Sequence, residues 1–262
     1  MMLIDGYGLI FRAYHAITAT MSTSKGEITN AVYGFASMLL NVLNTHHPAY
    51  AMVALESGRS FRHEEFEAYK AHRVAMPDEL RSQVVRIRQL IDALNIPIVE
   101  REGYEADDVI GSISLDAEKK GYETVIVSGD LDQLQLVDDS VRVMTTRKGV
   151  SDVVFYDVDA VHERYGFGPE FITDYKALVG DASDNIPGVP GIGPKSAAEL
   201  IQQFGHIEEM LARLDEVPEK YRKKIEPLKN EIPKYKWLAT IVRDVPVEFD
   251  YPPYVLTLDR LR

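Results

Sequence analysis

The stretch ETVIVSGDLD, residues 123–132, carries the pattern that decides the fold of the first half of the chain. Its apolar run ETVIV is followed by Asp130, and Asp132 comes two positions later. A short apolar run bounded by glycine predicts a buried β-strand. An acid just after a strand is most simply a turn or helix-capping residue, so this one example predicts no function.

The same pattern recurs along the first half of the chain. MLI (2–4) ends at Asp5, AYAMVAL (49–55) ends at Glu56, and IPIV (96–99) leads through a short loop to three acids, Glu105, Asp107 and Asp108. Helix-like stretches lie between these runs, at 29–45, 78–94 and 105–120. This alternation predicts an α/β fold, a parallel sheet with helices on both faces. Because ligands bind at the carboxyl ends of parallel strands, the acids are expected to converge on one edge.

The second half of the chain has a different organisation. Residues 141–156 contain VRVM and DVVFY, which predict a hairpin or an extension at the sheet edge. From about residue 157 to 242, helical patterns alternate with Gly and Pro and no long linker intervenes. We therefore expect an α/β unit over 1–156, a packed helical subdomain over 157–250 and a tail over 251–262.

Composition restricts the class of protein. The 262 residues are 45% hydrophobic, enough for a real core, and contain no run of 18 apolar residues that would predict a membrane span. Asp5 and Arg12 interrupt the N-terminal apolar stretch, which is unlike a signal peptide. The chain has no cysteine, which excludes disulfides and thiolate zinc sites. These features predict a cytoplasmic protein with no membrane partner.

The charge distribution leaves nucleic acid open as a partner. The net charge of −12 argues against phosphate binding when it is taken alone. However, residues 213–236 carry eight Lys and Arg against five acids, and RSFRHEEFEAYKAHR (59–73) carries four Lys and Arg with two His. Basic patches are therefore expected beside a separate concentration of acids.

Converging carboxylates predict a metal site. They cannot all remain ionised unless cations neutralise them, and oxygen ligands without Cys favour Mg²⁺ or Mn²⁺ over zinc. Seven acids suggest two ions, the arrangement that serves phosphoryl transfer. A phosphatase with an aspartate nucleophile also begins with Asp after the first strand. That class needs a second Asp two residues later, where this chain has Tyr7.

The glycine-rich stretch LVGDASDNIPGVPGIGPKSAAELI (178–201) adds two acids and a turn. Asp181 and Asp184 are spaced i, i+3, on one face of a helical turn. Three glycines mark a tight hairpin, and PKSAAELI begins a helix whose exposed amides could bind phosphate. An ordinary helix–helix turn is the alternative for a bare G-x-G, but the full string PGVPGIGPKSA is more specific. The glycines are Gly188, Gly191 and Gly193.

With these motifs in view, the sequence closely resembles the bacterial 5′ nuclease family. This family comprises the 5′→3′ exonuclease domain of DNA polymerase I and its stand-alone and phage relatives, with flap endonucleases more distant. The resemblance runs from about residue 2 to 250. It rests on LIDGYGLIFRAYHAI, AVYGF, SFRHEEFEAYKAHR, GYEADDVIG, SGDLDQLQLV and GDASDNIPGVPGIGPKSA.

The resemblance implies a PIN-like nuclease domain with a helical arch at about 59–76. A helical subdomain would follow, with a helix–three-turn–helix and a DNA-binding hairpin at about 180–204. Two Mg²⁺ ions, for which Mn²⁺ can substitute, would be held by two sets of acids. The first set is Asp5, Glu56, Glu105 and Asp107, the second is Asp130, Asp132, Asp181 and Asp184, and Asp108 lies between or behind them.

The resemblance also implies roles for residues that meet DNA. Lys70 and Arg73 would contact the scissile phosphate and stabilise the charge of the transition state. Tyr69 would stack on a base near the cleavage site. The remaining DNA contacts would be Arg12, Arg62, Gly188, Gly191, Gly193, Lys195 and Ser196, and carbonyls of the 187–193 hairpin would hold K⁺.

Two departures from the family pattern affect the metal sites. LESGRSFR places Glu56 where the family has Asp, in a loop one residue shorter. The longer side chain could still reach a metal, or it could leave the first site weak. Asp130–Leu131–Asp132 replaces the usual Asp-Lys-Asp, which removes one positive charge near the second site.

The implied function is structure-specific cleavage of DNA. A monomeric 5′→3′ exonuclease and 5′-flap endonuclease would hydrolyse phosphodiesters to 5′-phosphate products during replication and repair. The alternatives are a non-catalytic DNA-binding module whose metal site has decayed at Glu56, and a PIN-type ribonuclease. The resemblance leaves open whether the chain is a stand-alone enzyme or a domain of a longer polymerase.

Overall fold

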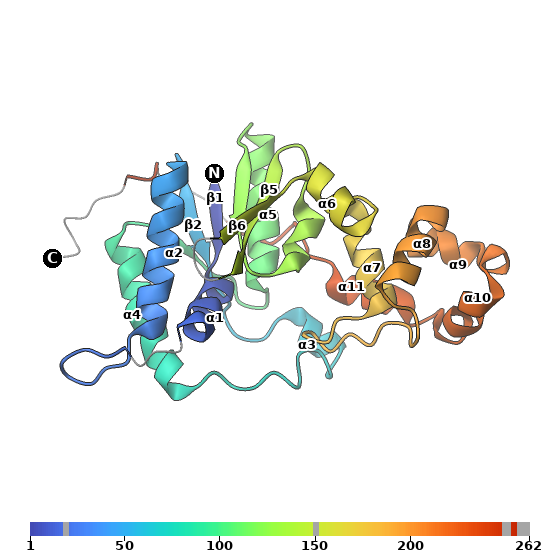
Figure 1. Ribbon diagram of the computed structural model, residues 1–262, viewed down its shortest axis with the longest axis horizontal. Coiled ribbons are helices and arrows are strands. Elements are labelled where there is room, and N and C mark those ends of the chain that lie inside the picture. Colours follow the sequence, from blue (N-terminus) through green and yellow to red (C-terminus); the bar gives the residue numbers. More distant parts are fainter. Residues whose placement is uncertain (18–20, 149–151, 248–252, 256–262) are drawn as a thin grey trace.

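The computed structural model describes residues 1–17, 21–148, 152–247 and 253–255, with side chains of 146–152 left aside. Most of the predicted tail, 251–262, therefore lies outside the described residues. Within them, no helix is long and apolar enough to cross a membrane. The molecule is elongated, with the sheet domain at one end and the helical subdomain at the other (Figure 1).

A six-stranded sheet forms the core of the first domain, in the order β3-β2-β1-β4-β5-β6. The first five strands run parallel, and β6 pairs antiparallel with β5 at the edge. The four predicted strands are confirmed, and the ambiguous stretch 141–156 forms an edge hairpin. The strands are β1 (Met2–Asp5), β2 (Ala51–Ala54), β3 (Ile98–Val99), β4 (Thr124–Val127), β5 (Val141–Lys148) and β6 (Asp152–Tyr156).

Helices cover both faces of this sheet, as the alternation predicted. Alternate residues of β1 point to opposite faces: Met2 and Ile4 join one apolar cluster, and Leu3 joins the other. The first cluster contains α1 (Gly6–Ala16), α2 (Asn30–His46) and α4 (Asp78–Ala93), and the second contains α5 (Ala106–Lys119) and the 3₁₀ helix η1 (Leu131–Leu136). The sheet is thus fixed from both sides, which fixes its carboxyl edge.

The helical subdomain shares its core with the sheet domain. Buried side chains of α8 and α10 belong to the same apolar cluster as those of α5, which confirms a packed subdomain rather than a tethered one. Its elements are α6 (Val158–Tyr165), η2 (Pro169–Phe171), α7 (Ile172–Val179), α8 (Pro194–Phe204), α9 (Ile207–Ala212), η3 (Leu214–Glu216), α10 (Glu219–Ile225), η4 (Glu226–Leu228) and α11 (Ile232–Ala239).

The arch segment, 59–76, is largely not helical. Its one helix is the short α3 (Phe61–Glu65), followed by turns and an extended stretch that runs to α4 below the sheet domain (Figure 1). Contacts with the 181–185 loop hold this chain: the N–H of Lys70 donates to the carbonyl of Asp184 at 3.0 Å, and the Asn185 amide donates to the carbonyl of Ala68 at 2.7 Å. Lys70 itself has a φ of 54°. The predicted helical arch at about 59–76 thus contains one short helix, and hydrogen bonds to the 181–185 loop hold the backbone that follows it.

Candidate active site

The predicted acids lie at the carboxyl edge of the sheet because several of them begin the elements that follow the strands. Asp5 caps α1, and its Oδ1 accepts a hydrogen bond from the N–H of Gly8 at 2.9 Å. Glu105 occupies the N-cap position of α5. Asp130 caps η1 by accepting from the N–H of Asp132 at 2.9 Å. Capping therefore explains why acids are tolerated at these positions, but not why they all lie at the same edge of the sheet.

An open cleft of about 520 Å³ joins four of the predicted metal ligands. Its lining includes Lys70, Arg73 and Arg12, whose positive charges face the same space, and Tyr7 and Phe11 from α1. The four acids that line it are Asp5, Glu56, Asp107 and Asp130. Glu56, the departure from the family pattern, thus opens on the same cleft as Asp5 and Asp107.

Burial works against the ionised form of these acids. It raises the pKa of Asp107 well above the ordinary value, and the charges of Asp130 and Asp5 raise it further. Burial likewise raises the pKa of Asp5, Glu56 and Asp130. In the described chain, none of these four carboxylates forms an ion pair within 4.0 Å. Clustered carboxylates that have no ion-paired partner fit a hard divalent cation such as Mg²⁺ or Mn²⁺.

The remaining predicted ligands already have cationic partners. Lys70 Nζ lies 2.7 Å from Glu105 Oε2 and 3.7 Å from Asp184 Oδ2, and Arg73 donates to Asp184 Oδ1 at 2.6 Å. Although burial acts to raise it, the pKa of Glu105 is held below its ordinary value by Lys70 and Arg62. Ion pairs therefore neutralise Glu105 and Asp184, whereas the four acids that line the cleft have no ion pair in the described chain.

Lys176 on α7 supplies the positive charge at Asp132 and Asp181. Its ammonium forms ion pairs with both carboxylates. Burial tends to raise the pKa of Asp181, but Lys176 and hydrogen bonds from Ser183 lower it to about 2. The sequence analysis missed Lys176. The signal available was a lysine in an otherwise apolar helical turn, five residues before Asp181.

Other polar residues that the sequence analysis missed orient the acids directly. Ser128 Oγ donates to Asp5 Oδ2 at 2.7 Å, and Gln133 Nε2 donates to Asp107 Oδ1 at 2.5 Å. Ser60 Oγ donates to Glu105 Oε1 at 2.8 Å. Ser128 and Gln133 are near Asp130 in sequence, so proximity to a strand-end acid was the one signal for them.

Arg62 does not occupy its predicted DNA-facing position, and Asp108 lies behind the cleft, which is one of the two positions predicted for it. Arg62 is 3% exposed and Asp108 is fully buried, and the guanidinium donates two hydrogen bonds of 2.7 Å to the carboxylate. Arg62 also donates to the carbonyls of Leu238 and Thr240 at 3.1 and 2.5 Å. Arg62 is therefore unavailable to DNA in this conformation, and Asp108 is committed to a buried pair rather than to a metal ion.

Tyr69 likewise does not occupy a stacking position. It is 2% exposed, and its hydroxyl lies 2.9 Å from Asp184 Oδ2 and 3.1 Å from Glu105 Oε2. The prediction that its ring stacks on a base is corrected, because the ring is covered and the hydroxyl joins two acids of the site. Tyr69 contributes by holding these carboxylates together.

The glycine hairpin has the geometry that PGVPGIGPKSA predicted. Gly188 has a φ of +65° and packs so closely that an added Cβ would lie 2.3 Å from the Gly180 nitrogen. Gly193 occupies the N-cap position of α8, and Lys195 is exposed and Ser196 half-buried in the first turn of that helix. The carbonyl of Gly191 accepts from Lys224 Nζ at 2.7 Å. Contacts of these residues with DNA or K⁺ remain predictions.

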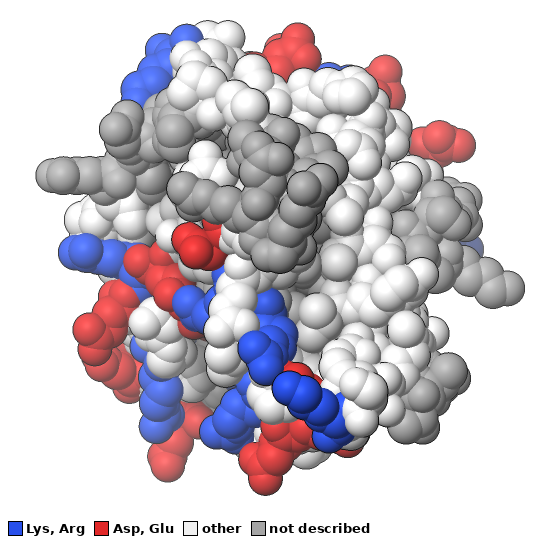
Figure 2. Space-filling view, turned by 90° about the vertical axis from the view of Figure 1, so that its left-hand side faces the viewer, with Lys and Arg blue, Asp and Glu red and all other residues white. Residues whose placement is uncertain are grey.

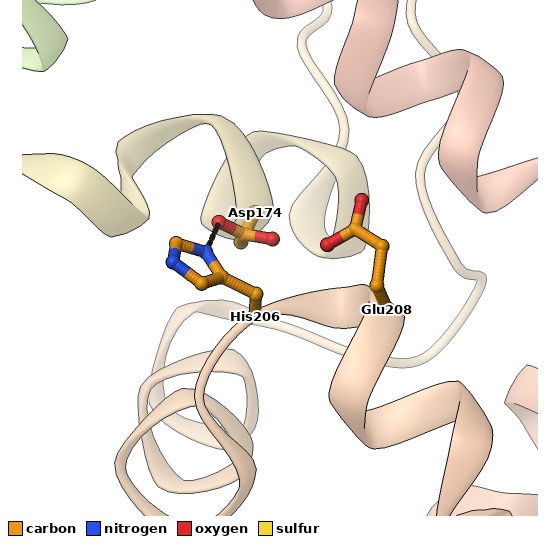
Figure 3. Close-up of side chains that lie close together, drawn as sticks. All are labelled: Asp174, His206 and Glu208. Atoms are coloured by element: carbon orange, nitrogen blue, oxygen red, sulfur yellow. Dashed lines mark hydrogen bonds and ion pairs between the residues drawn. The ribbon is translucent and has the colours of Figure 1, made fainter.

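A second group of possible ligands lies away from the cleft. Among the described residues, Asp174, His206 and Glu208 are the one group of three whose ligand atoms lie within 4.8 Å of one another (Figure 3). Lys236 Nζ forms ion pairs with both carboxylates of this group, 2.7 Å from Asp174 Oδ1 and 2.8 Å from Glu208 Oε2. His206 Nδ1 donates to Asp174 Oδ2 at 2.9 Å. The cluster thus joins α7, α9 and α11 without a metal. No trio of the strand-end acids is spaced this closely in the described chain.

The surface charges do not form a single basic face at the sheet-domain end. On the side that carries α2 and α4, Lys and Arg gather in one part of the view with Asp and Glu between them (Figure 2). Several are paired, as in Arg86 with Glu27 at 2.7 Å. This face is therefore a poorer candidate for phosphate binding than the cleft.

Two known protein families match consecutive parts of the chain. Residues 1–166 match the family of the 5′-3′ exonuclease N-terminal resolvase-like domain, and residues 167–259 match the 5′-3′ exonuclease C-terminal SAM fold. The chain belongs to the 5′-3′ exonuclease family, whose members are nucleases.

The chain is also similar to bacterial DNA polymerases. The chain is 46% identical over 250 residues to DNA polymerase I of Bacillus subtilis and 44% identical over 254 residues to that of Chloroflexus aurantiacus. Each match covers 95% of this chain but 28% and 27% of the relatives. The chain therefore spans less than a third of these polymerases.

Solved structures share the fold. The T5 5′-exonuclease with bound zinc has a TM-score of 0.73 at 24% identity, covering 91% of this chain and 88% of that one. A complex of the bacteriophage T5 D15 flap endonuclease with DNA and metal ions has a TM-score of 0.72 at 22% identity, with the same coverage. The catalytic core of Rad2 with DNA substrate has a TM-score of 0.64 at 18% identity, covering 99% and 84%.

Proposed function

We propose that this chain is a metal-dependent 5′→3′ exonuclease and 5′-flap endonuclease that acts on DNA. The observation that carries the proposal is the cleft that four acids, Asp5, Glu56, Asp107 and Asp130, share with the basic side chains of Lys70, Arg73 and Arg12. Acids alone would repel a phosphodiester. Cations at the acids, together with these basic side chains, would attract one.

The proposed ligands fall into two sets. Asp5, Glu56, Glu105 and Asp107 would hold one divalent cation, and Asp130, Asp132, Asp181 and Asp184 would hold the other. Two such ions, Mg²⁺ or Mn²⁺, would lower the pKa of the attacking water and stabilise the charge of the leaving oxygen. Asp108 leaves the predicted ligand set because Arg62 and backbone amides already satisfy it.

The protein's own residues would bind and orient the substrate. Lys70 and Arg73 would place positive charge beside the scissile phosphate, where it stabilises the phosphorane-like transition state. Ser128 and Gln133 would hold Asp5 and Asp107 in fixed orientations by the hydrogen bonds described above. A 5′-phosphate product follows from departure of the 3′-oxygen.

Specificity would come from shape rather than from base identity. The N-terminus of α8 and the amides of the 187–193 hairpin would hold the backbone of the adjoining duplex, with K⁺ as a possible ion at the hairpin carbonyls. The substrate would be duplex DNA beside a free 5′ end or flap, as in removal of primers and flaps during replication and repair. We propose that the activity belongs to the bacterial cytoplasm, at the nucleoid. The domain would be monomeric, and the full-length protein would contain a polymerase domain beside it.

Cleavage of a labelled 5′-flap duplex tests the proposal. Wild-type protein with Mg²⁺ or Mn²⁺ should cut near the junction, and a chelator should stop the reaction. Asp130→Asn should lose cleavage by 10²-fold or more, by analogy with removal of a charge-stabilising group, while it still binds the flap. The matched control is Asp139→Asn, which changes an exposed aspartate outside the cleft. Full cleavage by Asp130→Asn, or binding without cleavage by the wild type, would overturn the proposal, and preferential cutting of an RNA flap would favour a ribonuclease.

A further inference from the structure

We infer that Lys176 is an internal substitute for the second divalent cation, so that the two metal positions fill at different metal concentrations. The inference rests on the proposed function, because it concerns the order in which the same acids are occupied. It assigns Lys176 a role as a positioning residue that competes with an ion, rather than as a residue that touches the substrate.

The ammonium of Lys176 is enclosed by carboxylates. It forms ion pairs with Asp132 from η1 and with Asp181 from the loop after α7. The side chains are 13% exposed for Lys176, 15% for Asp132 and 12% for Asp181. A charged amine this far from solvent is stable where it is because both acids neutralise it. The ammonium therefore lies where a cation bound by both Asp132 and Asp181 would lie, and it already neutralises their charges.

The other half of the site has no such substitute. Of the first ligand set, Asp5, Glu56 and Asp107 form no ion pair in the part of the chain that the structure describes, and all three line the open cleft. Arg73 adds a second positive charge beside Asp184, the third acid of the neutralised half. Among the described residues, Glu105 is thus the one ion-paired acid of the first ligand set, whereas Asp132, Asp181 and Asp184 of the second set are all ion-paired.

This asymmetry sets an order of binding. The first divalent cation would bind at Asp5, Glu56 and Asp107, because none of these three carboxylates has an ion-paired cation that must leave. The second would have to displace the Lys176 ammonium from both partners, which weakens its net binding by the lost ion pairs. The four-carbon stem of lysine is flexible enough for the ammonium to move aside when the ion binds. Lys176 would therefore hold the second half of the site together until substrate and metal arrive.

Binding of Mn²⁺ without DNA tests the inference. Isothermal calorimetry and the loss of free-Mn²⁺ electron paramagnetic resonance signal would count the ions and give both affinities for residues 1–262. Wild type should show one tighter and one weaker ion. Lys176→Met removes the competing charge and should tighten the weaker ion at least tenfold, whereas Lys176→Arg, which keeps the charge, should resemble wild type. Lys229→Met, at an exposed lysine of the same subdomain, is the control.

Each outcome separates the inference from the proposed function. If Lys176→Met is folded by circular dichroism and the second ion binds equally or more weakly, the inference is wrong even when wild type cuts flaps. If the affinities change as expected while wild type cuts no flap, the inference holds and the proposed function fails. Should Lys176→Met unfold, Lys176→Gln removes the same charge with a polar side chain, and the same tightening is expected.

Discussion

Arg62 and Asp108 form a buried pair that fastens three separate segments of the chain. Two hydrogen bonds of 2.7 Å join the guanidinium to the carboxylate, which ties the short helix α3 to the start of α5. The same guanidinium bonds to the carbonyls of Leu238 and Thr240, and Asp108 accepts from the N–H of Val242 at 3.0 Å. The pair therefore couples the arch segment, the helix that carries Glu105 and Asp107, and the end of the helical subdomain.

Breaking this pair should strongly destabilise the protein. Arg62→Ala leaves the Asp108 carboxylate buried without its partner, and we expect a loss of about 3–5 kcal/mol in the free energy of unfolding, measured in urea. Arg81→Ala is the control, because Arg81 and Asp78 are exposed and 3.8 Å apart, and such pairs contribute about 0–1 kcal/mol. A loss below about 1 kcal/mol for Arg62→Ala would show that the pair does not anchor the three segments.

Tyr69→Phe distinguishes a hydrogen-bonding tyrosine from a stacking one. The variant keeps the ring but removes the hydroxyl that joins Glu105 to Asp184. We expect the free energy of unfolding to fall by about 1–3 kcal/mol, because hydrogen bonds to charged groups are lost in a buried site. Tyr33→Phe, at a tyrosine that is 57% exposed, should change stability little. Unchanged stability and cleavage in Tyr69→Phe would instead support stacking.

The stability of the metal-free protein should fall as the pH rises above the ordinary range of aspartate. Burial raises the pKa of Asp5, Asp107 and Asp130, so the folded state binds more protons than the unfolded chain between the ordinary and the raised pKa. Folding is then favoured by protons, and this contribution is lost as the pH rises through that window. Asp181, with a pKa of about 2, contributes the opposite trend, but only as the pH falls below about 4.

Added Mg²⁺ should reverse the effect of pH by replacing the protons. Mg²⁺ at a concentration a hundredfold above its Kd raises the free energy of unfolding by about 2.7 kcal/mol. We expect this gain to be larger at pH 8 than at pH 6, because protons compete with Mg²⁺ for the carboxylates at lower pH. Thermal melts with and without Mg²⁺ measure the difference. Asp107→Asn should stabilise the metal-free protein at pH 8 and reduce the gain from Mg²⁺. Equal gains at both pH values would mean that these acids do not bind the ion.

Gly188→Ala should damage the hairpin for a steric reason. At a φ of +65°, an added Cβ would lie 2.3 Å from the Gly180 nitrogen, and we expect a loss of about 1–3 kcal/mol or more in the free energy of unfolding. Gly193→Ala is a matched control, since its φ is −101° and nothing lies within 4 Å of the added atom. Similar losses in both variants would contradict the close approach of the two backbones at Gly188.

Local patterns predicted the sheet, its helices and the edge at which the acids converge. The periodicity of apolar residues and the position of an acid at a strand end are sufficient for these predictions, because both can be read from residues that are neighbours in the sequence. The roles of Arg62, Tyr69 and Lys176 depend instead on segments far away in the chain. Arg62 meets Leu238 across 176 positions, and Tyr69 meets Asp184 across 115. The resemblance implied that Arg62 and Tyr69 contact DNA, whereas Arg62 bonds to Leu238 and Thr240 and Tyr69 bonds to Asp184.

The location of bound Mn²⁺ tests the central claim most directly. Anomalous diffraction from a crystal of this protein with Mn²⁺ would locate each ion without relying on catalysis. We predict an ion beside Asp5, Asp107 and Asp130, with Glu56 close enough to be judged as a ligand. An empty cleft, with Mn²⁺ bound instead at Asp174, His206 and Glu208, would contradict the account.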